Sequence, residues 1–329
     1  MEEKLGLSID LGATRVRVCL GTSEGKILRR ATRKMDVGRD VGEYVAQIST
    51  LVSEVAAGIP MDRIQGVCLA SPGPLDLKRG LITHTANIPY RDVPIIDSLK
   101  ESLGFEAYLV NDANAAALGE KMWGAGRGRS NIFYLTISTG IGGGALVDGR
   151  LLIGKDGNAA EVGHTTIDSS GRLTCGCGRR GHWEAYCSGT GIPNLTRLLW
   201  EELGEATRPP SGTEPSKRMD SVSAADVFGE ADRGVPFALR VVEEVGRLNA
   251  IGVANVADAY DPELVTIGGG VALNNPERVL SPIKKSVGDY AINRVPEVMI
   301  TPLGDDAGLL GALSVAFDPS LIQPESASR

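Results

Sequence analysis

Four side chains that commonly bind transition metals gather in one stretch of the chain, between residues 157 and 184. They are His164, Cys175, Cys177 and His182. Imidazole and thiolate in a set of four suit tetrahedral Zn²⁺, and four protein ligands leave no open position for a reacting water. Such a site would be structural. The alternative is a glycine-rich surface loop with reduced thiols, because Cys-x-Cys is a closer spacing than zinc fingers use.

Two carboxylates, Glu161 and Glu184, stand near the two ends of this stretch. Glu161 precedes His164 by three residues, so the two side chains would share a face of a helical turn. A metal at the four ligands would hold the loop that bears both carboxylates in one shape. Because that metal would have no free position, we expect the reaction to be carried out by residues elsewhere.

A candidate for that reaction is Asp112. It follows an apolar strand at 107–110 and begins an alanine-rich run that is typical of a helix. Either Asn111 or Asp112 could cap this helix. Alternatively, Asp112 lies at the carboxyl end of a strand, where α/β enzymes bind their ligands, and could act as a general base. The residues alone leave both interpretations open.

Glycine turns occur at three further places. Residues 5–28 and 132–152 share one plan of strand, glycine turn, strand, turn and strand, with 9–14 corresponding to 137–142. Two similar sheets with a turn each could clamp a phosphate group; two unrelated hairpins are the alternative. The run 139–144 shows no packing purpose in the sequence and favours close approach of the backbone to an anion. A strand at 264–270 ends in three glycines that suit a base or ribose.

The elements that position these residues follow from hydrophobic spacing. Amphipathic or alanine-rich patterns predict helices at 41–57, 191–203, 223–233, 236–260 and 307–317, and apolar runs predict strands at 64–70 and 298–302. Residues 204–222 are polar and rich in proline and serine, which is typical of a surface loop. The tail from Asp318 is expected to be disordered.

Composition limits the class of protein. A chain of 329 residues exceeds one ordinary core, so two lobes are expected. The net charge of −7 without a basic run argues against nucleic acid or an anionic membrane as partner. Five cysteines, an odd number, indicate a reducing cytoplasm rather than a disulfide framework. The first strand begins near Leu5, which leaves no room for a signal peptide, and no apolar run is long enough to span a membrane.

Several motifs together resemble the ROK family of sugar kinases. They are DLGAT at 10–14, NDANAAALGE at 111–120, STGIGGG at 138–144, EVGH at 161–164, CGCGRRGHWEAYCSG at 175–189 and IGGG at 267–270. The resemblance implies an α/β protein with the two-lobed actin-like, hexokinase-like ATPase fold. The small lobe would comprise 1–117 completed by a helix at 305–318, and the large lobe 118–304, with a tail at 319–329. Repressors of the family carry a helix-turn-helix segment first, so a chain that starts at the first strand is expected to be a kinase.

The resemblance also implies roles for single residues. Asp112 matches the catalytic base; Asn111, Glu161, His164 and Glu184 match sugar contacts. Asn87, in a loop expected to lie near the 2-substituent of the sugar, is a further sugar-contact candidate. His164, Cys175 and Cys177 match zinc ligands, and His182 replaces the family's third cysteine, with Cys187 as a fallback ligand. The nucleotide and its phosphates would contact Asp10, Gly12, Ala13, Thr14, Arg15, Thr139, Gly140, Gly142, Gly143, Gly268, Gly269 and Gly270.

The activity implied is ATP-dependent phosphorylation of a hexose at its 6-hydroxyl, with glucose as the expected substrate. Mg²⁺ would offset the charge of the triphosphate, with Asp10 reaching it through water, and zinc would be structural. The nearest alternative is an N-acetylglucosamine or N-acetylmannosamine kinase of the same family. A sugar-responsive regulator without turnover is a third hypothesis. A cytoplasmic homodimer is the expected form.

Overall fold

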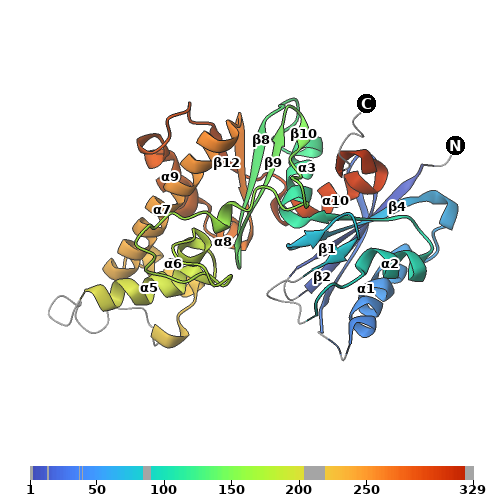
Figure 1. Ribbon diagram of the computed structural model, residues 1–329, viewed down its shortest axis with the longest axis horizontal. Helices are drawn as coiled ribbons and strands as arrows, with labels where there is room; N and C mark the ends of the chain where they lie inside the picture. The colour runs from blue at the N-terminus through green and yellow to red at the C-terminus, as the bar shows by residue number, and fades with distance from the viewer. Residues whose placement is uncertain are drawn as a thin grey trace. The chain divides into compact units, whose positions relative to one another are not determined.

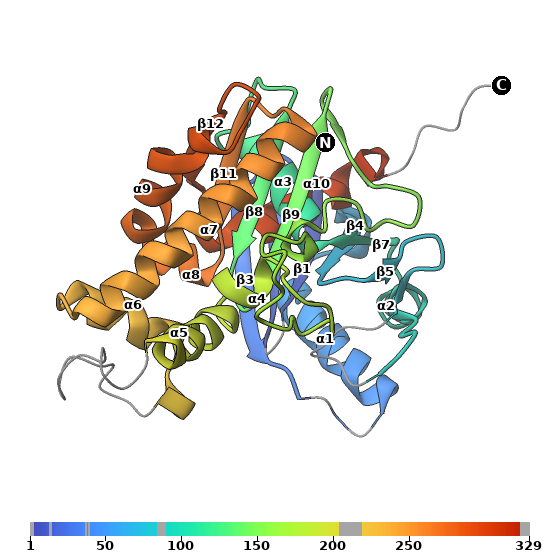
Figure 2. The same ribbon diagram turned by 60° about the vertical axis from the view of Figure 1, so that its left-hand side comes forward.

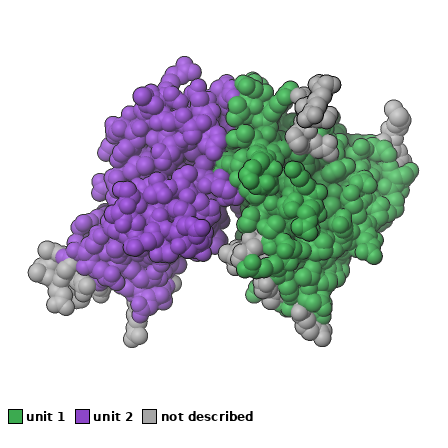
Figure 3. Space-filling view, viewed as in Figure 1, with its two compact units in different colours: residues 1–130, 144–160, 306–329 green, residues 131–143, 161–305 purple. Residues whose placement is uncertain are grey.

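The computed structural model describes residues 3–12, 15–36, 38, 40–83, 90–203 and 219–322. The chain divides into two compact units, coloured separately in Figure 3. Unit 1 comprises 1–130, 144–160 and 306–329, and unit 2 comprises 131–143 and 161–305. Within the part of the chain that the structure describes, no helix is both long and apolar enough to cross a membrane.

Unit 1 is built on a five-stranded sheet in the order β3-β2-β1-β4-β7 (Figure 1). The strands are β1 (Leu5–Leu11), β2 (Arg15–Thr22), β3 (Ile27–Lys34), β4 (Ile64–Ser71) and β7 (Ala107–Asn111). The first three form an antiparallel meander, and β4 and β7 extend the sheet in parallel to β1. A small hairpin of β5 (Leu75–Asp76) and β6 (Leu81–Ile82) follows β4.

The two faces of this sheet carry different residues because β1 alternates large apolar with small or polar side chains. Its odd-numbered residues are buried in a core with α1 (Val41–Ala56) and α2 (Ile95–Leu103). Its even-numbered residues face α10 (Ala307–Phe317), and a side chain at Gly6 would come within 2.8 Å of Phe317. The small residues thus let α10 pack closely against the sheet, next to α3 (Asp112–Trp123).

The second sheet repeats the plan of the first, with the order β10-β9-β8-β11-β12 (Figure 2). Its strands are β8 (Ile132–Ile137), β9 (Ile141–Val147), β10 (Arg150–Leu151), β11 (Leu264–Gly268) and β12 (Glu297–Ile300). As in unit 1, three strands consecutive in sequence are followed by two that lie parallel to the first of them. The predicted repeat of 5–28 at 132–152 is therefore confirmed.

Helices make up most of the rest of unit 2. They are α4 (Glu184–Cys187), α5 (Gly191–Glu202), α6 (Ala224–Asp232), α7 (Pro236–Tyr260), α8 (Gly270–Asn274) and α9 (Pro276–Ser286). Trp183 is completely buried against α7, where a side chain at Gly252 would come within 2.3 Å of the indole ring. The indole N–H donates to Asn249 at 2.9 Å. This contact fixes the segment that joins His182 to Glu184.

The structure departs from the sequence-based expectations in three places. Unit 1 continues to Ser130, beyond the expected limit at 117, because α3 packs along α10. The chain returns to unit 1 at Gly144, where a side chain would lie 2.3 Å from the carbonyl oxygen of Ala113. The tail expected to be disordered begins with a 3₁₀ helix, Pro319–Ile322; residues 323–329 lie outside the described ranges.

Candidate active site

In unit 1, the carboxyl ends of three parallel strands bring candidate residues together. Asp10 of β1 pairs in register with Ala70 of β4, and Ser71 of β4 pairs with Asn111 of β7. Gly308 of α10 faces this edge, and a side chain there would lie 3.8 Å from Oδ1 of Asp10 and 3.9 Å from the carbonyl oxygen of Asp112. Ligands of open parallel sheets bind at such edges.

The helix cap at α3 belongs to Asn111. Its Oδ1 accepts from the N–H groups of Ala113 and Asn114, at 3.0 and 3.1 Å. Asp112 is the first helical residue, and its Oδ1 accepts from the N–H of Ala113 at 2.8 Å. Because Asn111 already accepts from two of the free N–H groups of the first turn, as an N-cap residue does, the helix does not need Asp112 as its cap. The interpretation of Asp112 as a simple cap loses its main support.

Asp10 has a partner that the sequence-based assignment missed. Arg17, its cross-strand neighbour on β2, donates from Nε to Oδ2 of Asp10 at 2.9 Å and also from Nη2. Both side chains are largely shielded from solvent, with 22% of Arg17 and 15% of Asp10 exposed. Arg17 thus engages Oδ2, while Oδ1 lies on the side of Gly308.

In unit 2, the turn between β8 and β9, residues 138–141, is the equivalent of the turn after β1. The N–H of Ile141 donates to Oε2 of Glu184 at 2.9 Å. A side chain at Gly140 would lie 2.4 Å from that same oxygen. The expectation that the glycine run 139–144 has no packing purpose is therefore wrong at two positions: Gly140 makes room for Glu184, and Gly144 for α3.

The run Gly268–Gly270 ends β11 beside this turn. Gly269 has a φ of 87°, and a side chain there would lie 2.6 Å from the carbonyl oxygen of Ile137. Gly270 begins α8, with Ser138 Oγ 3.9 Å from where its side chain would start. Because β8 and β11 are parallel neighbours, the runs 138–141 and 268–270 at their carboxyl ends lie side by side.

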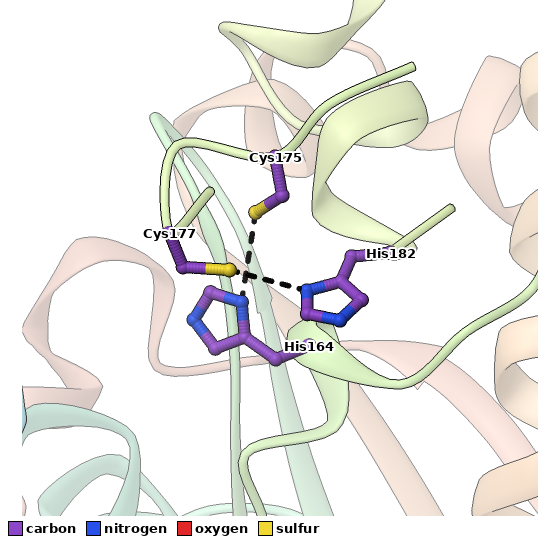
Figure 4. Close-up of side chains that lie close together, drawn as sticks. All are labelled: His164, Cys175, Cys177 and His182. Carbon is purple, nitrogen blue, oxygen red and sulfur yellow. Dashed lines mark hydrogen bonds between the residues drawn. The ribbon is translucent and has the colours of Figure 1, made fainter. Parts of the chain in front are cut away.

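The four predicted metal ligands converge (Figure 4). Their ligand atoms all lie within 4.8 Å of one another. Cys175 Sγ lies 3.6 Å from Nδ1 of His164, and Cys177 Sγ lies 3.3 Å from Nδ1 of His182. Tetrahedral bonds from zinc to sulfur and nitrogen separate two such atoms by about 3.5 Å, so the arrangement fits this ion. The fallback ligand Cys187 is buried elsewhere, with its thiol directed at the carbonyl oxygen of Val245.

The loop that carries the ligands has a second anchor. The carboxylate of Asp168 accepts from the hydroxyl of Tyr186 at 2.6 Å and from Nε of Arg172 at 3.0 Å. Although desolvation raises the pKa of Asp168, hydrogen bonds from Ser170, Tyr186 and Arg172 together hold it well below its usual range. Part of the loop is therefore ordered by interactions that need no metal.

The surroundings of Glu161 change its acidity. Desolvation raises the pKa of Glu161, the charge of Glu184 raises it further, and His164 opposes both effects. The side chain of Glu161 nevertheless keeps contact with solvent. Glu184 is also close to the metal cluster, because Oε1 lies 3.4 Å from Sγ of Cys175. Glu184 thus lies between Cys175 and the 138–141 turn.

Other predicted residues are placed differently or fall outside the described ranges. Gly12 lies in the turn after β1, where its N–H donates to the carbonyl oxygen of Arg15. Gly142 and Gly143 lie within β9 rather than in the turn. Ala13, Thr14 and Asn87 are outside the residues that the structure describes.

Comparison with known proteins agrees with this architecture. The model of the ROK family matches residues 6–318. A glucokinase of Thermotoga maritima is 36% identical over 313 residues, covering 94% of this chain and 96% of that protein. An N-acetylmannosamine kinase of Yersinia pestis is 33% identical over 310 residues, covering 93% and 96%. The structure of a ROK family glucokinase from Streptomyces griseus in complex with glucose and AMPPNP has a TM-score of 0.78 at 30% identity, covering 94% of this chain and 98% of that one.

These similarities identify the class. Two α/β units that repeat one strand plan, with a glycine turn in each, constitute the hexokinase-like ATPase fold. The chain belongs to the ROK family.

Proposed function

We propose that this protein is an ATP-dependent hexose kinase that phosphorylates glucose at the 6-hydroxyl. The observation that carries the proposal is the position of Asp112, a carboxylate at the carboxyl edge of the unit 1 sheet that is not required as the helix cap. The glucokinase relatives support the choice of glucose as the acceptor. Phosphoryl transfer requires mainly positioning and charge stabilisation, which the surrounding residues could supply.

In the proposed reaction, the oxygen of the sugar 6-hydroxyl attacks the γ-phosphorus of ATP. The bond from that phosphorus to the bridging oxygen breaks, ADP leaves, and Asp112 accepts the hydroxyl proton. Asn111, Glu161, His164 and Glu184 would orient the sugar through hydrogen bonds, those of the carboxylates being charge-assisted. Mg²⁺ bound with ATP would supply charge neutralisation, and Asp10 is the carboxylate that would reach it through water.

The direct test is ADP release with ATP and Mg²⁺, measured across glucose, mannose, fructose, glucosamine, N-acetylglucosamine and N-acetylmannosamine. We expect turnover on glucose. Turnover confined to the acetylated sugars would move the substrate to the alternative that the Yersinia pestis relative represents. Sugar binding without any ADP release would contradict the kinase assignment and indicate a sensor.

We propose further that His164, Cys175, Cys177 and His182 hold one structural Zn²⁺. The four ligand atoms and their spacing support this. Elemental analysis should find about one zinc per chain. Cys177→Ser should lower that content, and because Cys177 is exposed the variant should still fold. Cys187→Ala, which removes a thiol outside the cluster, should keep the zinc; equal loss in both variants would contradict the assignment.

We also propose that the protein works in the cytoplasm as a homodimer. All five cysteines are free, as a reducing compartment favours. The dimer rests on the family resemblance, and analytical ultracentrifugation measures it directly.

A further inference from the structure

The turn at 138–141 is held from one side by the segment that follows the last predicted metal ligand, His182. Three peptide groups of the turn bond to this segment, residues 184–190. The carbonyl oxygen of Ser138 accepts from the N–H of Gly189 at 2.6 Å. The carbonyl oxygen of Thr139 accepts from the N–H of Thr190 at 3.3 Å and from its Oγ1 at 3.0 Å. The carboxylate of Glu184 accepts a hydrogen bond from the N–H of Ile141.

These bonds fix the direction of two N–H groups. In a trans peptide, the C=O of one residue and the N–H of the next point in opposite directions. Because the carbonyl groups of Ser138 and Thr139 point at the segment, the N–H groups of Thr139 and Gly140 point away from it. Neither N–H group has a hydrogen-bond partner within the described ranges. Two successive free N–H groups form an arrangement that binds anions.

We propose that Thr190 is a positioning residue for the phosphates of the nucleotide. Its hydroxyl and its N–H occupy both lone pairs of the Thr139 carbonyl oxygen, which keeps the N–H of Gly140 turned toward the phosphate. Without the hydroxyl, the peptide between Thr139 and Gly140 is held by one long bond and can rotate. Thr190 itself does not touch the reacting atoms. This proposal rests on the proposed function, because it assumes a nucleotide at the turn.

The same segment begins two residues after the metal ligand His182. Glu184 therefore contacts both the 138–141 turn and the cluster of predicted metal ligands. One of its oxygens accepts from the N–H of Ile141, and the other lies near Cys175. Thr190, at the other end of the segment, has no contact with the metal ligands among the described residues. A substitution at Thr190 should thus affect the nucleotide while leaving the metal content and the sugar contacts unchanged.

The experiment is calorimetry with AMPPNP and, separately, with glucose, on the wild-type protein and on Thr190→Val, Thr190→Ser and Thr50→Val. Valine keeps the shape of threonine and removes the hydroxyl. We therefore expect AMPPNP affinity to fall by about three- to tenfold, and the KM for ATP, from steady-state kinetics, to rise by the same factor. Glucose affinity and zinc content should stay at the wild-type value. Serine, which restores the hydroxyl, should recover most of the loss.

Thr50→Val is the matched control, because Thr50 is an exposed threonine whose hydroxyl bonds to a helix carbonyl, that of Ala46, in unit 1. It should leave AMPPNP binding unchanged. Equal AMPPNP affinity in the wild type and Thr190→Val would overturn the role of Thr190, as would a parallel loss of glucose affinity. A wild-type protein that binds no AMPPNP would overturn the proposed function together with this inference.

Discussion

The two copies of the strand–turn–strand plan use their turns differently. In unit 1, the position at the end of the first strand is Asp10, a charged side chain with a guanidinium partner. In unit 2, the equivalent position is Ser138, and the turn offers backbone N–H groups instead. We therefore propose that the first turn acts through charged side chains and the second through peptide dipoles.

The supports of the two turns differ in the same way. Arg17 reaches Asp10 from the next strand of the same hairpin, so the first turn depends on local sheet register. The second turn is held by residues 184–190, about fifty positions along the chain. We infer that substitutions in unit 1 should act mainly through charge, and those in unit 2 mainly through the orientation of peptide groups.

The largest effect is expected at the carboxylate of the unit 1 edge. Asp112→Asn keeps an oxygen that can accept from the N–H of Ala113, so α3 should remain intact. It removes the base, and kcat should fall by about 10²- to 10⁴-fold while glucose still binds. Asp97→Asn, the same change in the first turn of α2, serves as the control. Near-normal turnover in Asp112→Asn would return Asp112 to a structural role.

The next comparison substitutes the equivalent residue in each of the two turns, Asp10 and Ser138. Asp10→Asn should lower kcat/KM for MgATP by about ten- to a hundredfold, because it removes a charge that would face the metal and leaves Arg17 without its anionic partner. Ser138→Ala should change this ratio little, because its turn acts through the backbone. Steady-state kinetics at several Mg²⁺ concentrations measures both. Equal effects of the two substitutions would contradict the proposal that the first turn acts through its side chains and the second through its backbone.

The third comparison concerns Glu184, which we propose as a sugar contact and which also accepts from the N–H of Ile141 in the 138–141 turn. In Glu184→Gln, the amide oxygen can still accept from the N–H of Ile141, so we expect the KM for glucose to rise by about tenfold and the KM for ATP to stay nearly constant. Glu184→Ala removes both interactions and should raise both KM values. If glutamine raised the two constants equally, Glu184 would not be a specific sugar contact.

Much of this arrangement could be predicted from the sequence. The alternation in β1 indicates which face is buried, the spacing of His164, Cys175, Cys177 and His182 predicts the cluster, and the repeated glycine turns predict the duplicated sheet. These features depend on local periodicity, or on ligand types that sit close together in sequence. Patterns of that kind survive in a single sequence.

The rest depended on tertiary contacts. The role of Arg17 follows from the register of β1 with β2, and that of Thr190 from a contact with a turn far away in sequence. The helix α9 was not predicted, because it contains Pro282 in its interior and proline has a low propensity for that position. Asn111 rather than Asp112 caps α3, a choice that depends on backbone angles at the strand end.

Nothing in the sequence predicts the backbone conformation of Ala160. Its φ is +64°, in the left-handed region, and it is buried at the point where the chain leaves unit 1 for unit 2. The other non-glycine residues with positive φ in the described ranges are Asp92, Asp148 and Asp261, whose short polar side chains tolerate this conformation better than alanine does. Asn158, just before it, is tied to Leu75 by two hydrogen bonds.

The smallest predicted effect therefore concerns this junction. Ala160→Gly should relieve the left-handed strain, which costs about 1–2 kcal/mol for an alanine, but glycine also gains freedom in the unfolded chain, worth about 0.4–1 kcal/mol. The net gain in the free energy of unfolding should be at most about 1.6 kcal/mol, the larger strain less the smaller entropy. Ala159→Gly, the control one residue earlier, relieves no such strain and should destabilise. If Ala160→Gly destabilised the protein as much as Ala159→Gly in denaturant titrations, packing around the buried methyl group would outweigh strain at the junction.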